Sequence, residues 1–203
     1  MNLSSLTDYR VLPVVTAADA ESTVKLARAL QRGGMKAIEI TLRTPAALDS
    51  MVAVQQEVPD ILVAAGTVNS PQDLDKVLNI GVEFALSPGA TPELLRAAAD
   101  SPIAFVPGVA TASEVMRGMA LGFEVFKLFP AVTVGGKGML NSLGGPFPDI
   151  RFCPTGGLNA ENFRDYLALP NVVCCGGSWM VKADLVAQGN WEEIESLARQ
   201  AMS

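Results

Sequence analysis

A regular alternation of short strand-like runs and longer helical stretches constrains the fold more than any other feature of this chain. Runs rich in β-branched and aromatic residues are typical of strands, and apolar residues at a spacing of three or four are typical of helices. The expected strands are 11–15, 36–40, 61–65, 82–86, 103–106, 124–128, 150–153 and 172–175. The expected helices are 19–32, 45–57, 70–79, 91–99, 111–120, 136–143, 159–168 and 190–202.

Residue types that favour helix ends support these boundaries. Side-chain oxygens at a helix start accept hydrogen bonds from N–H groups of the first turn, and glycine readily adopts the left-handed conformation that ends many helices. The expected starts are Ser70, Thr91 and Asn159, and the expected ends are Gly33, Gly81 and Gly122. Each helix leads directly into the next strand, which indicates parallel strands joined by right-handed crossovers.

Eight strand–helix units predict an α/β fold, a closed (β/α)8 barrel of the TIM type, in a single domain over residues 1–203. The length lies at the upper end for one domain, and no Pro- or Ser-rich linker divides the chain. An open doubly wound sheet is the alternative fold. The sequence contains neither a G-x-G-x-x-G nor a Walker A motif, which disfavours nucleotide binding.

Charge and hydropathy exclude several classes of function. A net charge of −6 offers no basic surface for nucleic acid. No apolar run reaches the roughly 18–20 residues of a membrane span, and the first residues lack the form of a signal peptide. We therefore expect a cytoplasmic protein with no nucleic-acid or membrane partner. The 49% of hydrophobic residues suits a large core and a subunit interface.

The absence of histidine restricts the chemistry further. It excludes Ser/His/Asp and Cys/His nucleophiles, His-ligated zinc, and histidine as a general base. The cysteines, two of them adjacent at Cys174 and Cys175, form neither a disulfide framework nor a metal-ligand spacing, and we expect buried, reduced thiols. Catalysis must then rely on Lys, Glu, Asp, Tyr or backbone groups.

Lys127 lies in the apolar run EVFKLFPA, where an unpaired ammonium group would be costly to bury. Side chains of a barrel strand alternate between the interior and the helix layer. Alternation predicts that Phe126 and Leu128 face the helices and that Lys127 faces the interior. In KAIEITLRT the same alternation directs Glu39 to the interior.

A desolvated lysine amine is a common nucleophile toward a carbonyl carbon, with which it forms a Schiff base. The Schiff base withdraws electrons and permits carbon–carbon bond cleavage or formation, which needs a proton carrier nearby. Glu39 is the expected carrier because histidine is absent. Two alternatives stay open: Lys127 could extend its ammonium group to solvent, and Glu39 could serve only as its ion-pair partner.

Further residues stand where the expected strands end, which is where such barrels collect their binding sites. They are Arg43, Thr67, Ser87, Pro88, Thr155 and Ser178. Arg43 is expected to bind a carboxylate through its planar guanidinium group, with a structural position at the rim as the alternative. Two glycine pairs, 156–157 and 176–177, follow the seventh and eighth expected strands and predict phosphate binding, with tight turns as the alternative.

The segments EITLRTP, AAGTV, FALSPG, FVPGVAT, FKLFPA, RFCPTGG and CCGGSW carry a family resemblance. Over nearly its whole length the chain resembles class I aldolases that act on 2-keto-3-deoxy-6-phosphogluconate (KDPG) and 4-hydroxy-2-oxoglutarate (KHG). The resemblance implies a (β/α)8 barrel, a homotrimer, and a lyase of the Entner–Doudoroff pathway. It implies cleavage of KDPG to pyruvate and glyceraldehyde 3-phosphate, and of KHG to pyruvate and glyoxylate, with no metal and no cofactor.

The resemblance also implies roles for individual residues. Lys127 would form the Schiff base with pyruvate, and Glu39 would transfer protons. The residues expected around the substrate are Arg43 and Thr67 at the pyruvate carboxylate, Thr155 in contact with the substrate, Phe129 and Pro88 around the imine, and Gly156, Gly157, Gly177 and Ser178 at the phosphate.

Two departures from the family pattern leave questions open. Thr16 ends the first expected strand where several relatives have arginine, so the preference for a phosphorylated substrate is uncertain. The segment ahead of that strand is also shorter than the helix that relatives often have there. Other functions stay open: an aldolase for the galactonate-derived analogue of KDPG, a sugar-phosphate isomerase or epimerase that uses Glu39 as base, and a silent sugar-phosphate binding protein.

Overall fold

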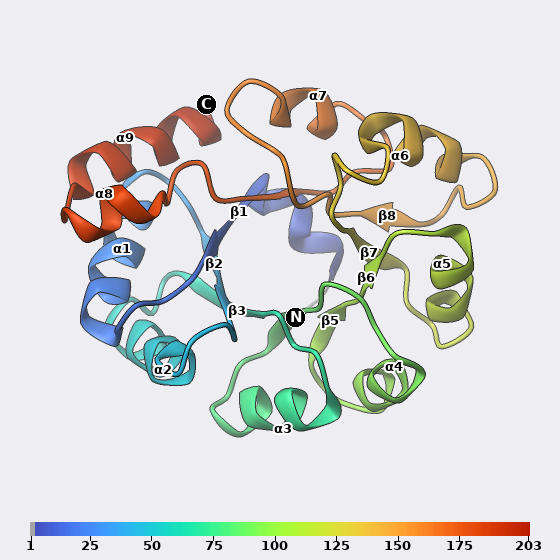
Figure 1. The fold of residues 1–203 in the computed structure, drawn as a ribbon, viewed down its shortest axis with the longest axis horizontal. Coiled ribbons are helices and arrows are strands. Elements are labelled where there is room, and N and C mark those ends of the chain that lie inside the picture. The colour runs from blue at the N-terminus through green and yellow to red at the C-terminus, as the bar shows by residue number, and fades with distance from the viewer. Residues whose placement is uncertain (1–2) are drawn as a thin grey trace.

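The computed structural model describes residues 3–203, with strands on the inside and helices on the outside (Figure 1). The strands are β1 Val11–Val15, β2 Ala37–Thr41, β3 Leu62–Gly66, β4 Phe84–Leu86, β5 Ala104–Val106, β6 Gly108–Val109, β7 Val125–Leu128, β8 Arg151–Phe152 and β9 Cys175–Gly177. The helices are the 3₁₀-helix η1 Leu3–Tyr9 and the α-helices α1 Ala20–Arg32, α2 Ala47–Glu57, α3 Pro71–Asn79, α4 Pro92–Ala99, α5 Ala112–Met119, α6 Gly136–Gly144, α7 Phe163–Leu167, α8 Ala183–Ala187 and α9 Trp191–Met202. Every expected strand and helix overlaps one of these elements, so the predicted alternation is confirmed.

The strands form two separate parallel sheets. Within residues 3–203, the larger sheet has six strands in the order β5-β4-β3-β2-β1-β9, and the smaller has three in the order β6-β7-β8. The prediction of one closed eight-strand TIM barrel is therefore wrong. Nine strands are present in this part of the chain, and no continuous hydrogen-bonded ladder joins the two sheets.

Prolines stand at both interruptions. Pro107 separates β5 from β6, and because proline has no N–H group it cannot continue the β5 ladder. Ahead of Pro107 the chain pairs with β4, and after it Gly108 pairs with Lys127 of β7. Pro154 lies just after β8, where only isolated bridges connect the chain to β9 and to the segment that leads into it. The expected fifth strand, 103–106, therefore corresponds to β5 alone, and β6 is an additional strand that was not predicted.

Side chains of both sheets meet in a common apolar interior. The buried members of this cluster are Leu6, Leu12, Ala37, Ala64, Phe84, Leu86, Ala104, Val106, Val125, Cys153 and Cys174. Leu6 belongs to η1, so the short segment ahead of β1 also packs against the interior. A second, larger cluster lies between the strands and the surrounding helices.

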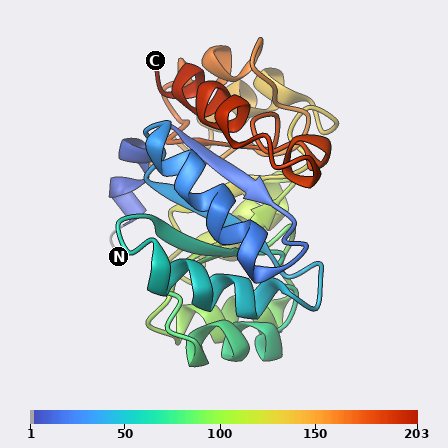
Figure 2. The same ribbon diagram turned by 90° about the vertical axis from the view of Figure 1, so that its left-hand side faces the viewer.

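The last helix returns to the start of the chain. Figure 2 shows α9 beside α1, and an ion pair of 2.7 Å between Arg32 and Glu195 links the two helices. A Cβ atom at Gly33 would lie 2.7 Å from the carbonyl oxygen of Glu195, so the glycine permits this close packing.

Most of the expected helix ends are confirmed. Ser70 and Thr91 accept hydrogen bonds from backbone N–H groups at the starts of α3 and α4. Asn159 also accepts two such bonds, although α7 itself begins further along the chain. The expectation of a left-handed Gly33 is wrong: its φ is −74°, and Gly34 has a φ of 93° instead. The other two expected glycines are left-handed.

Candidate active site

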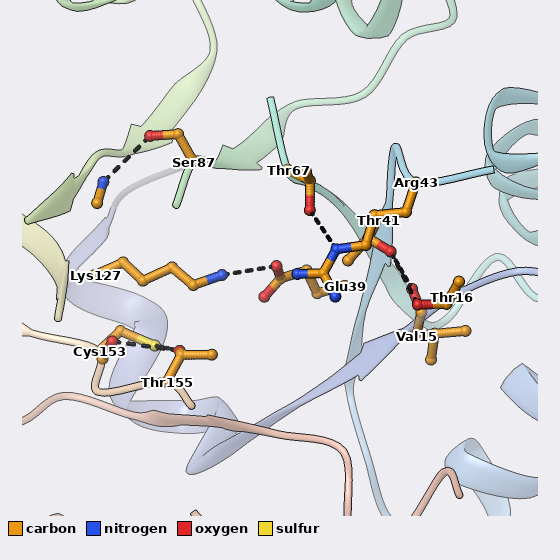
Figure 3. A network of polar contacts seen from close by, with 11 residues as sticks. Val15, Thr16, Glu39, Thr41, Arg43, Thr67, Ser87, Lys127, Cys153 and Thr155 are labelled. Atoms are coloured by element: carbon orange, nitrogen blue, oxygen red, sulfur yellow. Dashed lines mark hydrogen bonds and ion pairs between the residues drawn. The ribbon is translucent and has the colours of Figure 1, made fainter. Parts of the chain in front are cut away.

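Lys127 and Glu39 reach toward each other from the two sheets (Figure 3). Lys127 lies in β7 and Glu39 in β2, and Lys127 Nζ donates a hydrogen bond of 2.9 Å to Glu39 Oε1. Their side chains are 4% and 1% exposed. The expectation that both face the interior is confirmed, and the alternative of a solvent-directed Lys127 is wrong.

The neighbours of each residue along its strand produce this orientation. Successive side chains of a strand point to opposite faces, and apolar neighbours on the helix side leave the charged residue on the inner side. The neighbours buried in the layer between strands and helices are Phe126 and Leu128 in β7, and Ile38 and Ile40 in β2. The apolar pattern of the sequence is therefore what directs both charges inward.

The carboxyl group of Glu39 has one paired and one unpaired oxygen. Oε2 is buried and has no hydrogen-bond partner among the described residues. Buried polar atoms in proteins are nearly always hydrogen-bonded, so Oε2 is an acceptor that no group of residues 3–203 uses. On another side, Lys127 Nζ lies 5.6 Å from the ring centroid of Phe129, which is half-buried beside the pair.

Arg43 and Thr67 follow β2 and β3, and Figure 3 shows the side chain of Thr67 directed toward the guanidinium group of Arg43. Arg43 Nε donates a hydrogen bond of 3.1 Å to Thr67 Oγ1, and the arginine is exposed. Thr67 has a φ of 60°, which is rare and costly for a β-branched residue. Strain of this kind concentrates at functional sites, and here it accompanies a hydroxyl group that contacts the guanidinium group.

Thr41, the last residue of β2, is a buried threonine that was not proposed as a site residue from the sequence. Thr41 Oγ1 donates a hydrogen bond of 2.9 Å to the carbonyl oxygen of Val15 and lies 3.4 Å from Thr16 Oγ1. Thr41 stands two residues after Glu39 and shares its strand face, and that alternation is the signal that could have identified it.

Ser87 and Pro88 come from the end of β4 on the other side of the site. Ser87 Oγ accepts a hydrogen bond of 3.2 Å from the N–H group of Gly108, so this hydroxyl links the end of β4 to β6 of the smaller sheet. A Cβ atom at Gly108 would overlap the backbone of half-buried Pro88. Since Gly108 pairs with Lys127, Pro88 lies against the strand next to the lysine.

Thr155 is buried below the lysine, after β8 (Figure 3). Its Oγ1 lies 3.5 Å from the carbonyl oxygen of Cys153 and 3.9 Å from the sulfur of that residue. A hydrogen bond with the Cys174 side chain holds the pKa of Cys153 below the usual value of a thiol, and the same contact, with burial, raises the pKa of Cys174. The expectation of buried, free thiols is confirmed.

The first glycine pair lies in the loop between β8 and α7. Gly156 and Gly157 have φ values of 98° and 81°. Their carbonyl oxygens accept hydrogen bonds of 3.1 Å from the Val132 N–H group and 3.2 Å from Asn162 Nδ2. Their own N–H groups donate to no acceptor among the described residues. Such free N–H groups are suited to an anion.

We had expected the second glycine pair in the loop after the last strand. That expectation is wrong, because both glycines belong to β9. A Cβ atom at Gly176 would overlap the side chain of Thr155, and one at Gly177 would overlap the ring of Trp179. Close packing thus accounts for both glycines. Ser178 follows directly, is exposed, and borders the same cleft as Thr16, between the β1–α1 and β9–α8 connections.

Two further properties concern the described part of the chain. Within residues 3–203, no group of three or more His, Cys, Asp and Glu side chains is arranged to hold a metal ion. No helix in the same range has the length and apolar character needed to cross a membrane.

Comparison with known proteins places these residues in a family. The model of the family described as KDPG and KHG aldolase matches residues 3–197. The KHG/KDPG aldolase of Escherichia coli (strain K12) is 47% identical over 199 residues, 98% of this chain and 93% of that protein. The 2-dehydro-3-deoxy-phosphogluconate aldolase of Dickeya dadantii (strain 3937) is 48% identical over 198 residues, which are 98% of this chain and 93% of that protein. A crystal structure of KDPG aldolase from Legionella pneumophila, with pyruvate captured at low pH as a covalent carbinolamine intermediate, has a TM-score of 0.96 at 42% identity and covers 99% of this chain and 98% of that chain. The chain therefore belongs to the KDPG and KHG aldolase family.

Proposed function

We propose that this protein is a class I aldolase that cleaves KDPG to pyruvate and glyceraldehyde 3-phosphate. The observation that carries the proposal is the buried 2.9 Å contact between Lys127 Nζ and Glu39 Oε1, which provides an amine and a proton carrier side by side. Its relative from Escherichia coli is named as a KHG/KDPG aldolase, which supports KHG as a second substrate, cleaved to pyruvate and glyoxylate.

Imine formation uses the existing hydrogen bond. Lys127 passes a proton to Glu39 along it, which frees the amine lone pair to attack the keto carbon of the substrate. The carbonyl π bond breaks as the nitrogen–carbon bond forms, and a proton moves from the nitrogen to the new alkoxide to give a carbinolamine. Glu39 then gives its proton to the hydroxyl group, which leaves as water as the protonated imine forms. The intermediate captured in the Legionella pneumophila enzyme is a carbinolamine of pyruvate.

Cleavage uses the same carboxyl group in the opposite direction. The Glu39 carboxylate removes the proton of the 4-hydroxyl group, the C3–C4 bond breaks, and its electron pair moves toward the imine nitrogen. The aldehyde leaves, and the remaining enamine takes a proton at C3. Water then hydrolyses the pyruvyl imine and restores the lysine. Glu39 Oε2, buried without a protein partner, is suited to accept the hydroxyl proton.

The two anionic ends of the substrate require different groups. Arg43 holds the pyruvate carboxylate, since it is exposed just after the end of β2, the strand that carries Glu39, and its Nε contacts Thr67. Free N–H groups at Gly156 and Gly157 bind the phosphate. The remaining assigned residues are Gly177 and Ser178 near the phosphate, and Pro88, Phe129 and Thr155 around the imine. From family resemblance alone, we also propose a cytoplasmic homotrimer.

Replacing Lys127 tests the proposal. A Lys127→Met variant keeps an unbranched side chain of similar length but has no amine, so aldolase turnover should fall by at least about a thousand-fold. Borohydride reduction with pyruvate, followed by peptide mass mapping, should place a pyruvyl adduct on the Lys127 peptide of the unsubstituted protein and none on the variant.

Lys25→Met is the matched control. Lys25 forms an exposed ion pair with Glu21 on α1, far from the interior pair in sequence and environment, so this variant should keep turnover and adduct. Circular dichroism should show both variants folded. An adduct on a different lysine, or full activity in Lys127→Met, would contradict the assignment.

A further inference from the structure

Gly66 ends β3 beside the carboxyl group of Glu39. Gly66 pairs with Thr41 across the β2–β3 ladder, and its carbonyl oxygen accepts a 2.9 Å hydrogen bond from the N–H group of Leu42. A Cβ atom at this position would overlap Glu39 Oε1 and would lie 2.7 Å from Cγ and 2.9 Å from Cδ of Glu39. Carbon atoms in favourable contact are about 3.5–4.0 Å apart, so a methyl group has no room there.

Backbone conformation does not explain the glycine. The residues with left-handed φ include eight glycines, and Gly66 is not among them. A glycine inside a strand weakens it and often marks a place where another group approaches closely. At this position the approaching group is a carboxyl group that is itself fully buried.

The position of that carboxyl group is narrowly defined. Lys127 Nζ lies 2.9 Å from Oε1, and the space where a Cβ atom of residue 66 would stand is bordered by Oε1, Cδ and Cγ of Glu39. A methyl group at residue 66 would displace the carboxyl group, and proton transfer requires donor and acceptor within hydrogen-bond reach.

We propose that Gly66 is a positioning residue: the missing side chain lets Glu39 lie across the end of β3 with Oε1 facing Lys127 Nζ. The inference rests on the proposed function, in which Glu39 transfers protons. It adds a residue whose role is exerted through Glu39 and not through contact with substrate.

A double-mutant cycle separates this role from a general effect on folding. Truncating the side chain in Glu39→Ala removes Oε1, Cδ and Cγ, the atoms that a methyl group at residue 66 would meet. We therefore expect Gly66→Ala to lower kcat about 100-fold in the presence of Glu39, and to lower the residual kcat less than about 3-fold in the Glu39→Ala background. KM should change less than kcat.

Proton transfer can be followed without cleavage of a carbon–carbon bond. Exchange of the methyl protons of pyruvate with D₂O, measured by NMR, reports protonation of the enamine, and it should show the same non-additive pattern across the four proteins. Gly138→Ala is the matched control. Gly138 is exposed in α6, a Cβ atom there would meet nothing within 4 Å, and activity should stay within about 2-fold.

Equal losses from Gly66→Ala in both backgrounds would overturn the inference, and so would unchanged exchange in Gly66→Ala. If Gly66→Ala does not fold, the double variant decides: a folded double variant supports the collision with Glu39, and an unfolded one overturns it. Failure of the proposed function looks different, because the unsubstituted protein would then show neither exchange nor a pyruvyl adduct.

Discussion

A buried lysine and a buried glutamate depend on each other for their stability. Removing either charge from water costs several kcal/mol, and the attraction between the two groups offsets that cost only when they are in contact. In this protein the contact of Lys127 Nζ with Glu39 Oε1 is 2.9 Å, and the second oxygen of Glu39 has no protein partner. The proposed function uses this arrangement for proton exchange with the substrate.

Glu39→Gln tests this at the level of one residue. Glutamine has nearly the shape of glutamate and still accepts a hydrogen bond from Lys127, but it cannot take up a proton. We expect kcat to fall by about 10²–10⁴-fold, as is typical for loss of a general acid–base group. Steady-state kinetics measures the loss, and borohydride trapping should still detect some pyruvyl adduct. Turnover within a few-fold of the unsubstituted protein would remove Glu39 from the mechanism.

Individual helices carry their own start signals, which act independently of the site. Ser70 Oγ accepts a 3.1 Å hydrogen bond from the N–H group of Asp73 at the start of α3, and Thr91 and Thr111 do the same for α4 and α5. Each bond satisfies an N–H group that has no partner within the helix. These local interactions explain why the helix starts could be predicted from short stretches of sequence.

Ser70→Ala tests this at the level of one helix. Loss of the cap should lower the free energy of unfolding by about 1 kcal/mol, because one N–H group of the first turn loses its acceptor. Urea denaturation followed by circular dichroism measures the change. Ser70→Asp should restore most of the stability, since aspartate is an equally good cap, and both variants should retain full aldolase activity. Equal stability of Ser70→Ala and the unsubstituted protein would show that the cap is not used.

Packing helps to hold the whole molecule together where no ladder of hydrogen bonds does. No continuous ladder joins the six-stranded and three-stranded sheets of residues 3–203. Isolated bridges and a few side-chain hydrogen bonds link them, and the apolar interior that they share adds to these links. Phe84 has the largest side chain among the buried residues of this interior and is fully buried. In the sheet it pairs with the small residues Ala64 and Ala104 of the neighbouring strands.

Phe84→Ala should therefore lower the free energy of unfolding by about 3–5 kcal/mol, through lost apolar burial and the cavity left behind. The urea midpoint measures this, with the slope of the transition unchanged. Met116→Ala is the control, because Met116 on α5 is 60% exposed and its loss should change stability by less than about 0.5 kcal/mol. Similar effects of the two substitutions would contradict a connecting role for the interior.

The sequence by itself determined the order of strands and helices and the inward direction of Lys127 and Glu39. Both follow from short-range causes: apolar periodicity sets the element type, and alternation sets the face. The roles of the substrate-binding residues came from family resemblance and stay predictions. Gly66 was missed because its importance depends on the side chain that lies next to it, across a strand, whereas Thr41 could have been recognised from the strand face that it shares with Glu39.

Only the tertiary structure decided how the strands are divided between two sheets. A proline can be located in the sequence, but whether it separates two strands depends on the strands that pair with the chain on each side of it. Here the chain pairs with β4 before Pro107 and with β7 after it. In the same way, the 2.9 Å separation of Lys127 and Glu39 is a property of two sheets packed on one interior. Strand faces are local, whereas distances between sheets are set by all the side chains that fill the space between them.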